Sequence, residues 1–410
     1  CGGAAVGKEE GDPKESVQGQ PVEVIHIFSS LAKGGAESRT LELIEWMSSK
    51  AKGLHVTVYQ VGQAGEMAGR FRDAGSTVIT QRFRSPSFWI GLTKRLRLHS
   101  TTTLHLHVKR GITRPAVLLP VAAAAGVPTR VVHFRSDGTH AGGSLLARLS
   151  ESFNYRLIDA FATDIIGVSP AALERGWSSS WRGDPRCRVM LSGLNLSPYT
   201  NLAKTEHLRN LVGCGPDDTL MVHVGRDTPV KNRSRAVRIL SAVSDRRFHL
   251  IFIGRNEQVA SSALEELALA LGVAGQVHLL GERDDVPQLM ADADLTLLTS
   301  THEGLPGVVL ESLASGTPVL ATDLPGTRFI ANKIDNVTVV PLAETDGLWA
   351  EEARRLTTPT GRPRRTEIAD PLHNSEFDLD RAAGAFLTLW TTRRRRKALP
   401  KAHDSALPPD

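Results

Sequence analysis

The chain has 410 residues, 41% of them hydrophobic and 23% charged, with a formal net charge of +5. This length exceeds what one ordinary core accommodates and predicts two domains, and the composition is that of a globular chain rather than a disordered one. No apolar run approaches the roughly 18 residues that a membrane helix needs. The three cysteines, Cys1, Cys187 and Cys214, lie far apart, so no metal site or disulfide framework is expected, and a reducing compartment is indicated.

The two ends of the sequence differ from its middle. Residues 1–20 are rich in Gly, Lys and Glu and are expected to be disordered. Cys1 fits the first residue of a mature lipoprotein, but a trimmed sequence is the favoured interpretation. The basic run 393–397 predicts either a solvated tail or attraction to anionic lipid headgroups. Because no aromatic residues interleave with these charges, nucleic acid is not an expected partner.

From residue 21 onward, short apolar strands alternate with segments of helical periodicity. The strands expected in the first half are 22–28, 56–61, 77–80, 103–107, 130–134 and 164–168. Helical segments are expected between them at 41–47, 67–74, 89–98, 116–125 and 145–160. Such alternation predicts a parallel sheet with helices on both faces.

Polar and Pro-containing residues interrupt this pattern over 197–218 and predict a linker. The alternation then restarts, with strands expected at 220–224, 250–253, 276–279, 295–298 and 318–321. We therefore expect an α/β protein with two tandem Rossmann-like, doubly wound domains, over 21–196 and 219–375. These domains either share one cleft or are independent. In such sheets ligands bind beyond the carboxyl ends of the strands.

The most informative stretch of sequence, 300–311, directly follows the expected strand 295–298. Pro306 suits the first turn of a helix, because its missing N–H costs nothing there. The start of such a helix attracts anions, phosphate above all. The amides expected to be free for this purpose are those of Gly307, Val308 and Val309.

Two glutamates flank this helix start. Glu303 precedes the helix and Glu311 lies in its second turn. Carboxylates in these positions can accept hydrogen bonds from vicinal sugar hydroxyls, such as those of a ribose. The alternative is two ordinary surface glutamates.

The residues after the strand 220–224 form a second candidate element. Arg226 and Lys231 flank a turn that opens a helix, and both can hold a diphosphate, one as a bidentate fork and one as a point charge. Cleavage of a nucleotide–sugar bond leaves additional negative charge on the diphosphate. Two cations and a helix N-terminus stabilise that charge without a metal ion. The alternative is two solvated basic residues.

The first half of the chain offers weaker candidates. Gly34 and Gly35 follow the first strand and allow close approach of the backbone to a ligand. His107 lies nearer than His105 to the carboxyl end of its strand and is the more plausible cleft residue, although a structural histidine is the alternative. Three further residues rank lower as an acceptor-side lining, namely His133, Arg135 and Asp137.

Taken together, these motifs resemble the retaining glycosyltransferases of the GT-B fold, known as the glycosyltransferase 4 family. The resemblance runs from about Val22 to Trp390 and is most specific between Asp294 and Gly326. In the family, the closing helix, here at 376–392, crosses back to the first domain and is followed here by a basic tail over 393–410.

The resemblance also implies an activity. A sugar would pass, with retention and without a metal, from a nucleotide-diphosphate sugar to a hydroxyl of a saccharide or lipid-linked acceptor. A UDP-sugar is the favoured co-substrate, with no cofactor, although the residues leave the base and the sugar open. Cell-surface, exopolysaccharide or glycolipid biosynthesis is the expected setting, in the cytoplasm or peripheral to the inner face of the membrane.

The resemblance assigns roles to individual residues. Arg226 and Lys231 would hold the diphosphate, and Glu311 the ribose. Glu303 would contact the transferred sugar, and His107 matches a position next to the reacting centre. The other implied donor-side residues are Gly35, Arg283, Gly304, Leu305, Val308 and Val309. The competing interpretations are a nucleotide-sugar epimerase, a phosphorylase and a silent binding scaffold; the complete set of two glutamates and two cations favours transfer.

Overall fold

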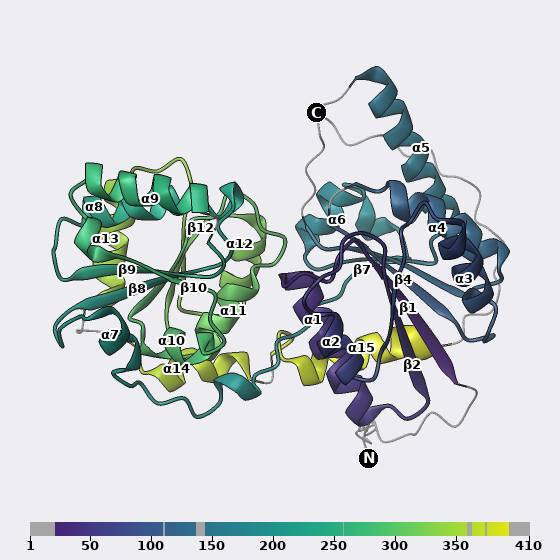
Figure 1. Cartoon of the computed structure of the whole chain (residues 1–410), viewed down its shortest axis with the longest axis horizontal. Coiled ribbons are helices and arrows are strands. Elements are labelled where there is room, and N and C mark those ends of the chain that lie inside the picture. The colour runs from purple at the N-terminus through teal and green to yellow at the C-terminus, as the bar shows by residue number, and fades with distance from the viewer. Residues whose placement is uncertain are drawn as a thin grey trace, which may run out of the picture.

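The computed structural model describes residues 21–109, 111–136, 144–256, 258–358, 363–373 and 375–392. The expectations for residues 1–20, for Asp137 and for the tail over 393–410 lie outside this part of the chain. Two parallel β-sheets, each with helices on both faces, form two α/β units that stand side by side (Figure 1). The expected α/β class with two Rossmann-like units is confirmed.

The first sheet has seven strands in the order β3-β2-β1-β4-β5-β6-β7. Its strands are β1 (Val22–Phe28), β2 (Leu54–Gln60), β3 (Thr77–Thr80), β4 (Thr103–Val108), β5 (Thr129–Phe134), β6 (Asp164–Gly167) and β7 (Cys187–Val189). The helices around it are α1 (Gly35–Lys50), α2 (Ala68–Asp73), α3 (Pro86–Leu96), α4 (Thr113–Ala124), α5 (Leu145–Phe161) and α6 (Pro170–Gly176).

The second sheet has six strands in the order β10-β9-β8-β11-β12-β13. Its strands are β8 (Thr219–Val224), β9 (Phe248–Ile253), β10 (Val277–Gly281), β11 (Leu295–Leu298), β12 (Val319–Thr322) and β13 (Val337–Val340). Its helices are α7 (His207–Val212), α8 (Arg233–Val243), α9 (Gln258–Ala270), α10 (Val286–Asp292), α11 (Gly307–Ala314), α12 (Pro325–Ala331), α13 (Asp346–Thr357) and α14 (Arg365–Ala369).

Burial explains why the central strands are mostly apolar. All seven residues of β1 and all four of β11 are buried, because helices cover both faces of each sheet. The apolar pattern did not predict β7 or β13, which lie at sheet edges and are mostly only half-buried. The edge strands β3 and β10 are no more buried and were predicted, so partial burial alone does not explain the two misses. Strand β7 has only three residues, one of them Arg188, which is too short for an apolar pattern to be recognised.

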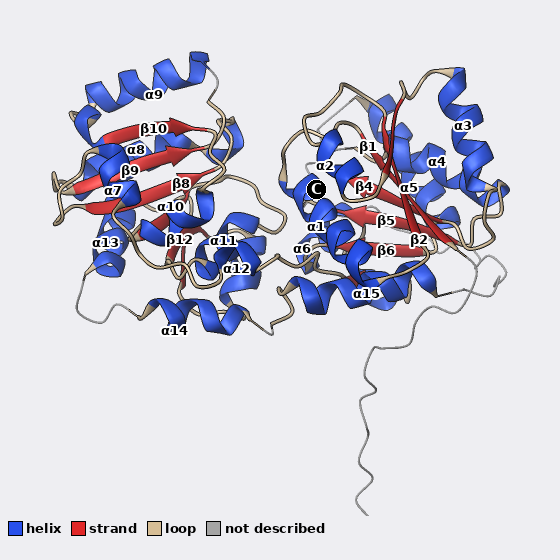
Figure 2. Ribbon diagram, turned by 60° about the horizontal axis from the view of Figure 1, so that its bottom comes forward, coloured by secondary structure: helices blue, strands red, loops and turns tan. Residues whose placement is uncertain are grey.

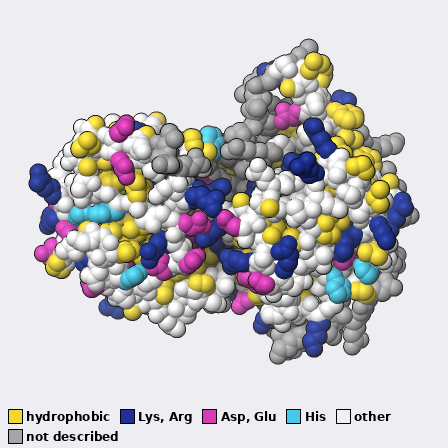
Figure 3. Space-filling view, viewed as in Figure 1, with side chains coloured by type: hydrophobic (Ala, Val, Ile, Leu, Met, Phe, Trp, Pro, Cys, Tyr) yellow, Lys and Arg dark blue, Asp and Glu magenta, His cyan; other side chains and the backbone are white. Residues whose placement is uncertain are grey.

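Strand order reverses between β1 and β4 in the first sheet and between β8 and β11 in the second. A reversal leaves a crevice at the carboxyl edge of the sheet, where the loops diverge to opposite faces. The two reversal points face each other (Figure 2), since loops that follow carboxyl ends of both sheets meet. Charged side chains of both signs gather where the two units join (Figure 3).

The chain passes between the two units twice. It leaves the first after Met190 and returns through Phe377 to α15 (Leu379–Thr391), the last helix of the described residues, which packs on α1 and β1. The two passages touch, because the Leu194 amide donates to the Phe377 carbonyl at 2.8 Å. Gly193 allows this contact, since a Cβ there would lie 2.5 Å from the Cα of Leu379.

Helix α15 covers an apolar surface of the first unit. Phe386 and Trp390 are buried against residues of β1, α1 and β5. Among the described residues, no helix combines the length and the apolar character needed to cross a membrane.

Candidate active site

The loop after β8 brings two basic residues to the crevice of the second sheet. Gly225 has φ of +149°, and a Cβ there would lie 2.9 Å from Lys231 Cε, so glycine makes room for the lysine stem. Lys231 Nζ donates to Glu303 Oε1 at 2.7 Å. Arg226 is exposed and, within the described chain, makes no hydrogen bond or ion pair, so its guanidinium is available to a ligand.

The loop after β11 holds Glu303 in place. The same Oε1 atom accepts a second hydrogen bond from Ser300 Oγ at 2.8 Å. The Thr301 amide donates to the Val230 carbonyl at 2.8 Å, which joins this loop to the one after β8. Lys231 and Glu303, 72 residues apart in sequence, are therefore positioned by backbone contacts between neighbouring loops.

Helix α11 begins at Gly307, and Pro306 is its N-cap residue and not part of its first turn. The expectation of three free amides is wrong in one respect, because the Val309 amide donates to the Pro306 carbonyl at 3.1 Å. Proline has an extended ψ of 102° here, which turns its carbonyl toward the first turn of the helix. The amides of Gly307 and Val308 make no such backbone bond in the part of the chain that the structure describes.

Glu311 is already engaged by the first unit. Its Oε1 accepts from Arg39 Nη2 of α1 at 2.8 Å, and Arg39 also donates to Glu42 at 2.8 Å. All three side chains are about four-fifths buried, with exposed fractions of 17–21%. No sequence pattern indicated this partner, since Arg39 is one of several charged residues on a helical face.

The Glu303 loop also approaches the first unit through its backbone. A Cβ on Gly304 would lie 2.5 Å from the Arg135 carbonyl oxygen, so only glycine fits this junction. Leu305 packs against apolar clusters of both units. The candidate site is thus built by both halves of the chain.

On the opposite wall, Gly35 is the first residue of α1 and has no other heavy atom near its missing side chain. Lys109, which follows β4 and was not singled out from sequence, pairs with the buried Glu37. Burial lowers the pKa of Lys109, Glu37 opposes this effect, and the neighbouring charges of Arg135 and Arg226 lower the pKa further. Cations from both units therefore converge on one region, which suits an anionic ligand.

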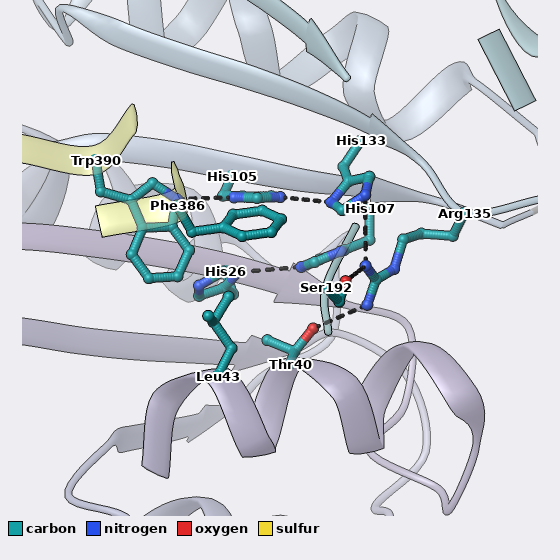
Figure 4. A pocket seen from close by; sticks show the side chains of 10 residues that line it. All are labelled: His26, Thr40, Leu43, His105, His107, His133, Arg135, Ser192, Phe386 and Trp390. Carbon is teal, nitrogen blue, oxygen red and sulfur yellow. Dashed lines mark hydrogen bonds between the residues drawn. The ribbon is translucent and has the colours of Figure 1, made fainter. Parts of the chain in front are cut away.

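His107 lies in a cluster of four histidines from β1, β4 and β5 (Figure 4). Its Nε2 is 3.0 Å from His26 Nδ1, its ring stacks on Phe28 at 4.3 Å between centroids, and its buried Nδ1 has no hydrogen-bond partner within the described chain. Burial is the main cause that lowers the pKa of His107 well below its usual value, so the ring is uncharged at neutral pH.

A chain of hydrogen bonds fixes the tautomers in this cluster. The Trp390 indole N–H, which can only donate, lies 3.1 Å from His105 Nδ1, so the proton of neutral His105 is on Nε2. His105 Nε2 then donates to His133 Nδ1 at 3.1 Å. The pKa of His105 and His133 is also lowered, chiefly by burial.

Arg135 closes this cluster at the interface between the units. Its Nη1 donates to Ser192 Oγ at 2.6 Å and its Nη2 to the Ala36 carbonyl at 2.8 Å. Burial lowers the pKa of Arg135 to about 10, so it remains a cation at neutral pH.

Arg283 lies after β10 at the same edge of the second sheet, and its side chain pairs with Asp285 at 2.6 Å. The neighbouring Glu282 pairs across the two units with Lys33 at 3.2 Å. The structure therefore brings the second-domain candidates to one edge, and places Arg283 at the outer end of that edge.

Comparison with known proteins agrees with this architecture. Residues 218–358 match the family model described as glycosyl transferases group 1. The putative glycosyltransferase EpsF of Bacillus subtilis is 25% identical over 380 residues, which cover 90% of this chain and 96% of that protein. The capsular polysaccharide biosynthesis glycosyltransferase CapH of Staphylococcus aureus is 22% identical over 74% of this chain and 82% of its own.

The fold has a solved counterpart in Anabaena HepE, crystallised with UDP and glucose. The two structures superpose with a TM-score of 0.74 at 19% identity, over 89% of this chain and 98% of that one. The two α/β units, with their crevices facing each other, have the GT-B fold. With the group 1 match and the full-length relatives, the chain is identified as a glycosyltransferase.

Proposed function

We propose that this glycosyltransferase moves a sugar, with retention and without a metal ion, from a UDP-sugar to a hydroxyl of a saccharide or lipid-linked acceptor. The observation that carries the proposal is the pairing of Lys231 Nζ with Glu303 Oε1 at 2.7 Å beside Arg226, which has no partner within the described chain. The Anabaena HepE structure holds UDP and glucose, which supports this donor class. The relative named for capsule biosynthesis supports a role in making a cell-surface polysaccharide.

In the proposed reaction, the bond between the anomeric carbon and the diphosphate oxygen breaks, and the acceptor oxygen bonds to the same face of that carbon. The acceptor hydroxyl gives its proton to the departing diphosphate. Arg226 and Lys231 stabilise the negative charge that develops on the diphosphate, with the amides of Gly307 and Val308 as further donors. These donors offset the leaving-group charge in place of a divalent ion.

Glu303 would bind hydroxyls of the transferred sugar once Lys231 turns to the diphosphate. Ser300 keeps the carboxylate in place during this exchange, because it donates to the same oxygen at 2.8 Å. Glu311 would accept the ribose hydroxyls in place of, or alongside, Arg39. We propose that Arg283 lies beside the base, and that Gly35 and Gly304 allow close approach of the backbone.

His107 would face the reacting sugar as an uncharged ring. Its lowered pKa makes it a weak general base. It would therefore form a hydrogen bond with a sugar hydroxyl rather than take up a proton. This role agrees with the transfer of the acceptor proton to the diphosphate.

A peripheral membrane position is part of the proposal. Leu146, Leu149 and Phe153 of α5 share one face at helical spacing and have exposed fractions of 77%, 58% and 60%. Such an apolar stripe, together with the basic tail, suits an anionic bilayer that presents a lipid-linked acceptor. Co-sedimentation with anionic vesicles, compared with neutral ones, measures this property directly.

The test of the donor site is a panel of UDP-, GDP- and ADP-sugars with the purified chain, Glu303→Gln and Lys231→Met. We expect slow release of nucleoside diphosphate from one UDP-sugar, without added Mg²⁺ or Mn²⁺. Each variant should lower kcat/KM by about 10²- to 10³-fold, the usual cost of losing one charge-stabilising donor. Lys52→Met, a change at an exposed lysine distant from the crevice, is the matched control.

Three results would contradict the proposal: no donor binding, a requirement for added Mg²⁺ or Mn²⁺, or an inverted anomeric configuration of the product by NMR. Conversion of the sugar while it stays attached to UDP would instead indicate the epimerase.

A further inference from the structure

A second cluster of chemically active side chains lies at the opposite edge of the second sheet. His249 and His278 are the second residues of β9 and β10, and Cys214 follows α7. The cysteine sulfur and one nitrogen of each histidine lie within 4.8 Å of one another. The donor crevice is at the carboxyl ends of these strands, about 13 Å away, because four residues of β9 follow His249.

Strand register brings the two histidines together. His278 pairs with Ile251 across the two strands, and His249 is two residues before Ile251, so both histidines point to the same face of the sheet. His249 Nδ1 and His278 Nε2 are 3.1 Å apart. In a tetrahedral zinc site with bonds of about 2.0–2.1 Å, two imidazole nitrogens are separated by about 3.3 Å. The observed separation therefore already fits a shared ion.

The loop that carries the cysteine is held firmly. Helix α7 ends at Gly213, whose φ of +70° turns the chain, and the Cys214 amide donates to the Arg209 carbonyl at 3.0 Å. Arg209 Nη1 donates to the Asp218 carbonyl at 3.0 Å, and the Asp218 side chain accepts from the Gly215 amide at 2.6 Å. These contacts place the thiol beside the histidines.

Metal-binding histidines commonly have a carboxylate near the ring nitrogen that does not bind the metal, and Asp218 is in this position. Its Oδ2 lies 3.6 Å from His249 Nε2, on the ring atom opposite the one that faces His278. A carboxylate there favours a proton on Nε2 and leaves Nδ1 free as a ligand. Cys214, His249 and His278 are each half-buried, which leaves room for a fourth ligand from solvent.

We propose that Cys214, His249 and His278 bind one Zn²⁺ ion, with the Asp218 carboxylate facing His249 Nε2 and water as the fourth ligand. One thiolate and two imidazoles are a donor set that suits this ion. Because the site is remote from the donor crevice, the ion takes no part in glycosyl transfer. It ties the loop that enters the second domain to β10, the edge strand of the sheet.

The histidine cluster of the first unit is a poorer candidate for an ion, although His105, His107 and His133 also offer three nitrogens within 4.8 Å. Arg135 Nη1 lies 3.4 Å from His133 Nε2, and its positive charge opposes a divalent cation. That cluster also has no thiolate, so spectroscopy can tell the two sites apart.

The experiment uses the untagged chain of 410 residues, stripped of metal by a chelator and then titrated with Co²⁺ and Zn²⁺. We expect one equivalent of Co²⁺ to give a thiolate-to-cobalt charge-transfer band and the visible bands of tetrahedral cobalt, and one equivalent of Zn²⁺ to remove both. Cys214→Ser should abolish the charge-transfer band. Asp218→Asn should keep the band and weaken zinc binding by about 10- to 100-fold, the usual effect of losing such a partner.

Cys187→Ser is the matched control, because Cys187 is the other cysteine in the described chain and is likewise half-buried. It should leave cobalt and zinc binding unchanged. Absence of the charge-transfer band in the unmodified chain, or its survival in Cys214→Ser, overturns the proposal. If circular dichroism shows that Cys214→Ser does not fold, His278→Gln replaces it, with loss of the tetrahedral cobalt bands as the expected result. The outcome is independent of the glycosyl-transfer assay.

Discussion

At the scale of single residues, two buried tryptophans differ in whether the indole N–H has a hydrogen-bond partner. The Trp390 N–H donates to a buried histidine nitrogen at 3.1 Å. Trp349 of α13 is equally buried, but its indole N–H has no partner among the described residues. Substituting each tryptophan therefore distinguishes the contribution of the hydrogen bond to stability from the contribution of the buried ring.

We expect Trp390→Phe to lower the free energy of unfolding by about 1–3 kcal/mol more than Trp349→Phe. Both changes remove ring volume, but only the first leaves a buried acceptor without its donor. Urea titration followed by circular dichroism measures both values. Equal losses in the two variants would show that the hydrogen bond adds no stability.

At the scale of helices and strands, the sequence predicted the central elements and missed the partly buried edge strands β7 and β13. Apolar periodicity reports burial, so it identifies most readily the strands that are covered on both faces, and it gives no signal for β7, which has only three residues including Arg188. The candidate site divides similarly. The loops with Glu303 and Arg226 follow strongly apolar strands, whereas Arg39, Lys109 and the Cys214 cluster depend on contacts between distant segments that no local spacing records.

The strands β1, β4, β5 and β8 also set the response of the protein to acid. Burial lowers the pKa of His26 and His223 to about 3, and that of His105, His107 and His133 well below its usual value. In the unfolded chain these rings bind protons below about pH 6.5. The unfolded state therefore takes up more protons than the folded one between about pH 6.5 and 3, and stability falls as the pH falls through this range.

We expect the free energy of unfolding to fall by up to about 1.4 kcal/mol per buried histidine for each pH unit below 6.5. Denaturant unfolding at about pH 7.5 and about pH 5.5 measures the combined slope. His223→Gln should reduce that slope by close to one proton, whereas His55→Gln, at an exposed position, should leave it unchanged. A stability that is constant between these pH values would contradict the assignment of buried, neutral rings.

At the scale of the whole molecule, Gly304 is a point where the backbones of the two units come into direct contact. A methyl group there would lie 2.5 Å from the Arg135 carbonyl oxygen, so Gly304→Ala must separate the units locally. Gly275 of the second unit is the matched control, because a methyl group there would meet no other heavy atom within 4 Å.

We expect Gly304→Ala to lower kcat by up to about 10²-fold, since a displacement of about 1 Å between groups that must act together has that effect. Stability should change little, because each unit keeps its own core. Gly275→Ala should retain full activity. Steady-state kinetics with the donor identified by the panel measures both, and equal activity of the two variants would show that this junction does not govern transfer.

The double passage of the chain has a consequence for how the protein is made. Because α15 completes the apolar surface of β1 and α1, the first unit cannot finish folding until the last helix has left the ribosome. The second unit, which contains all six of its strands between residues 219 and 340, is synthesised before then. Domains fold as units during synthesis, so we expect the unit made second to reach its native state first, while the nascent first unit waits with one face uncovered.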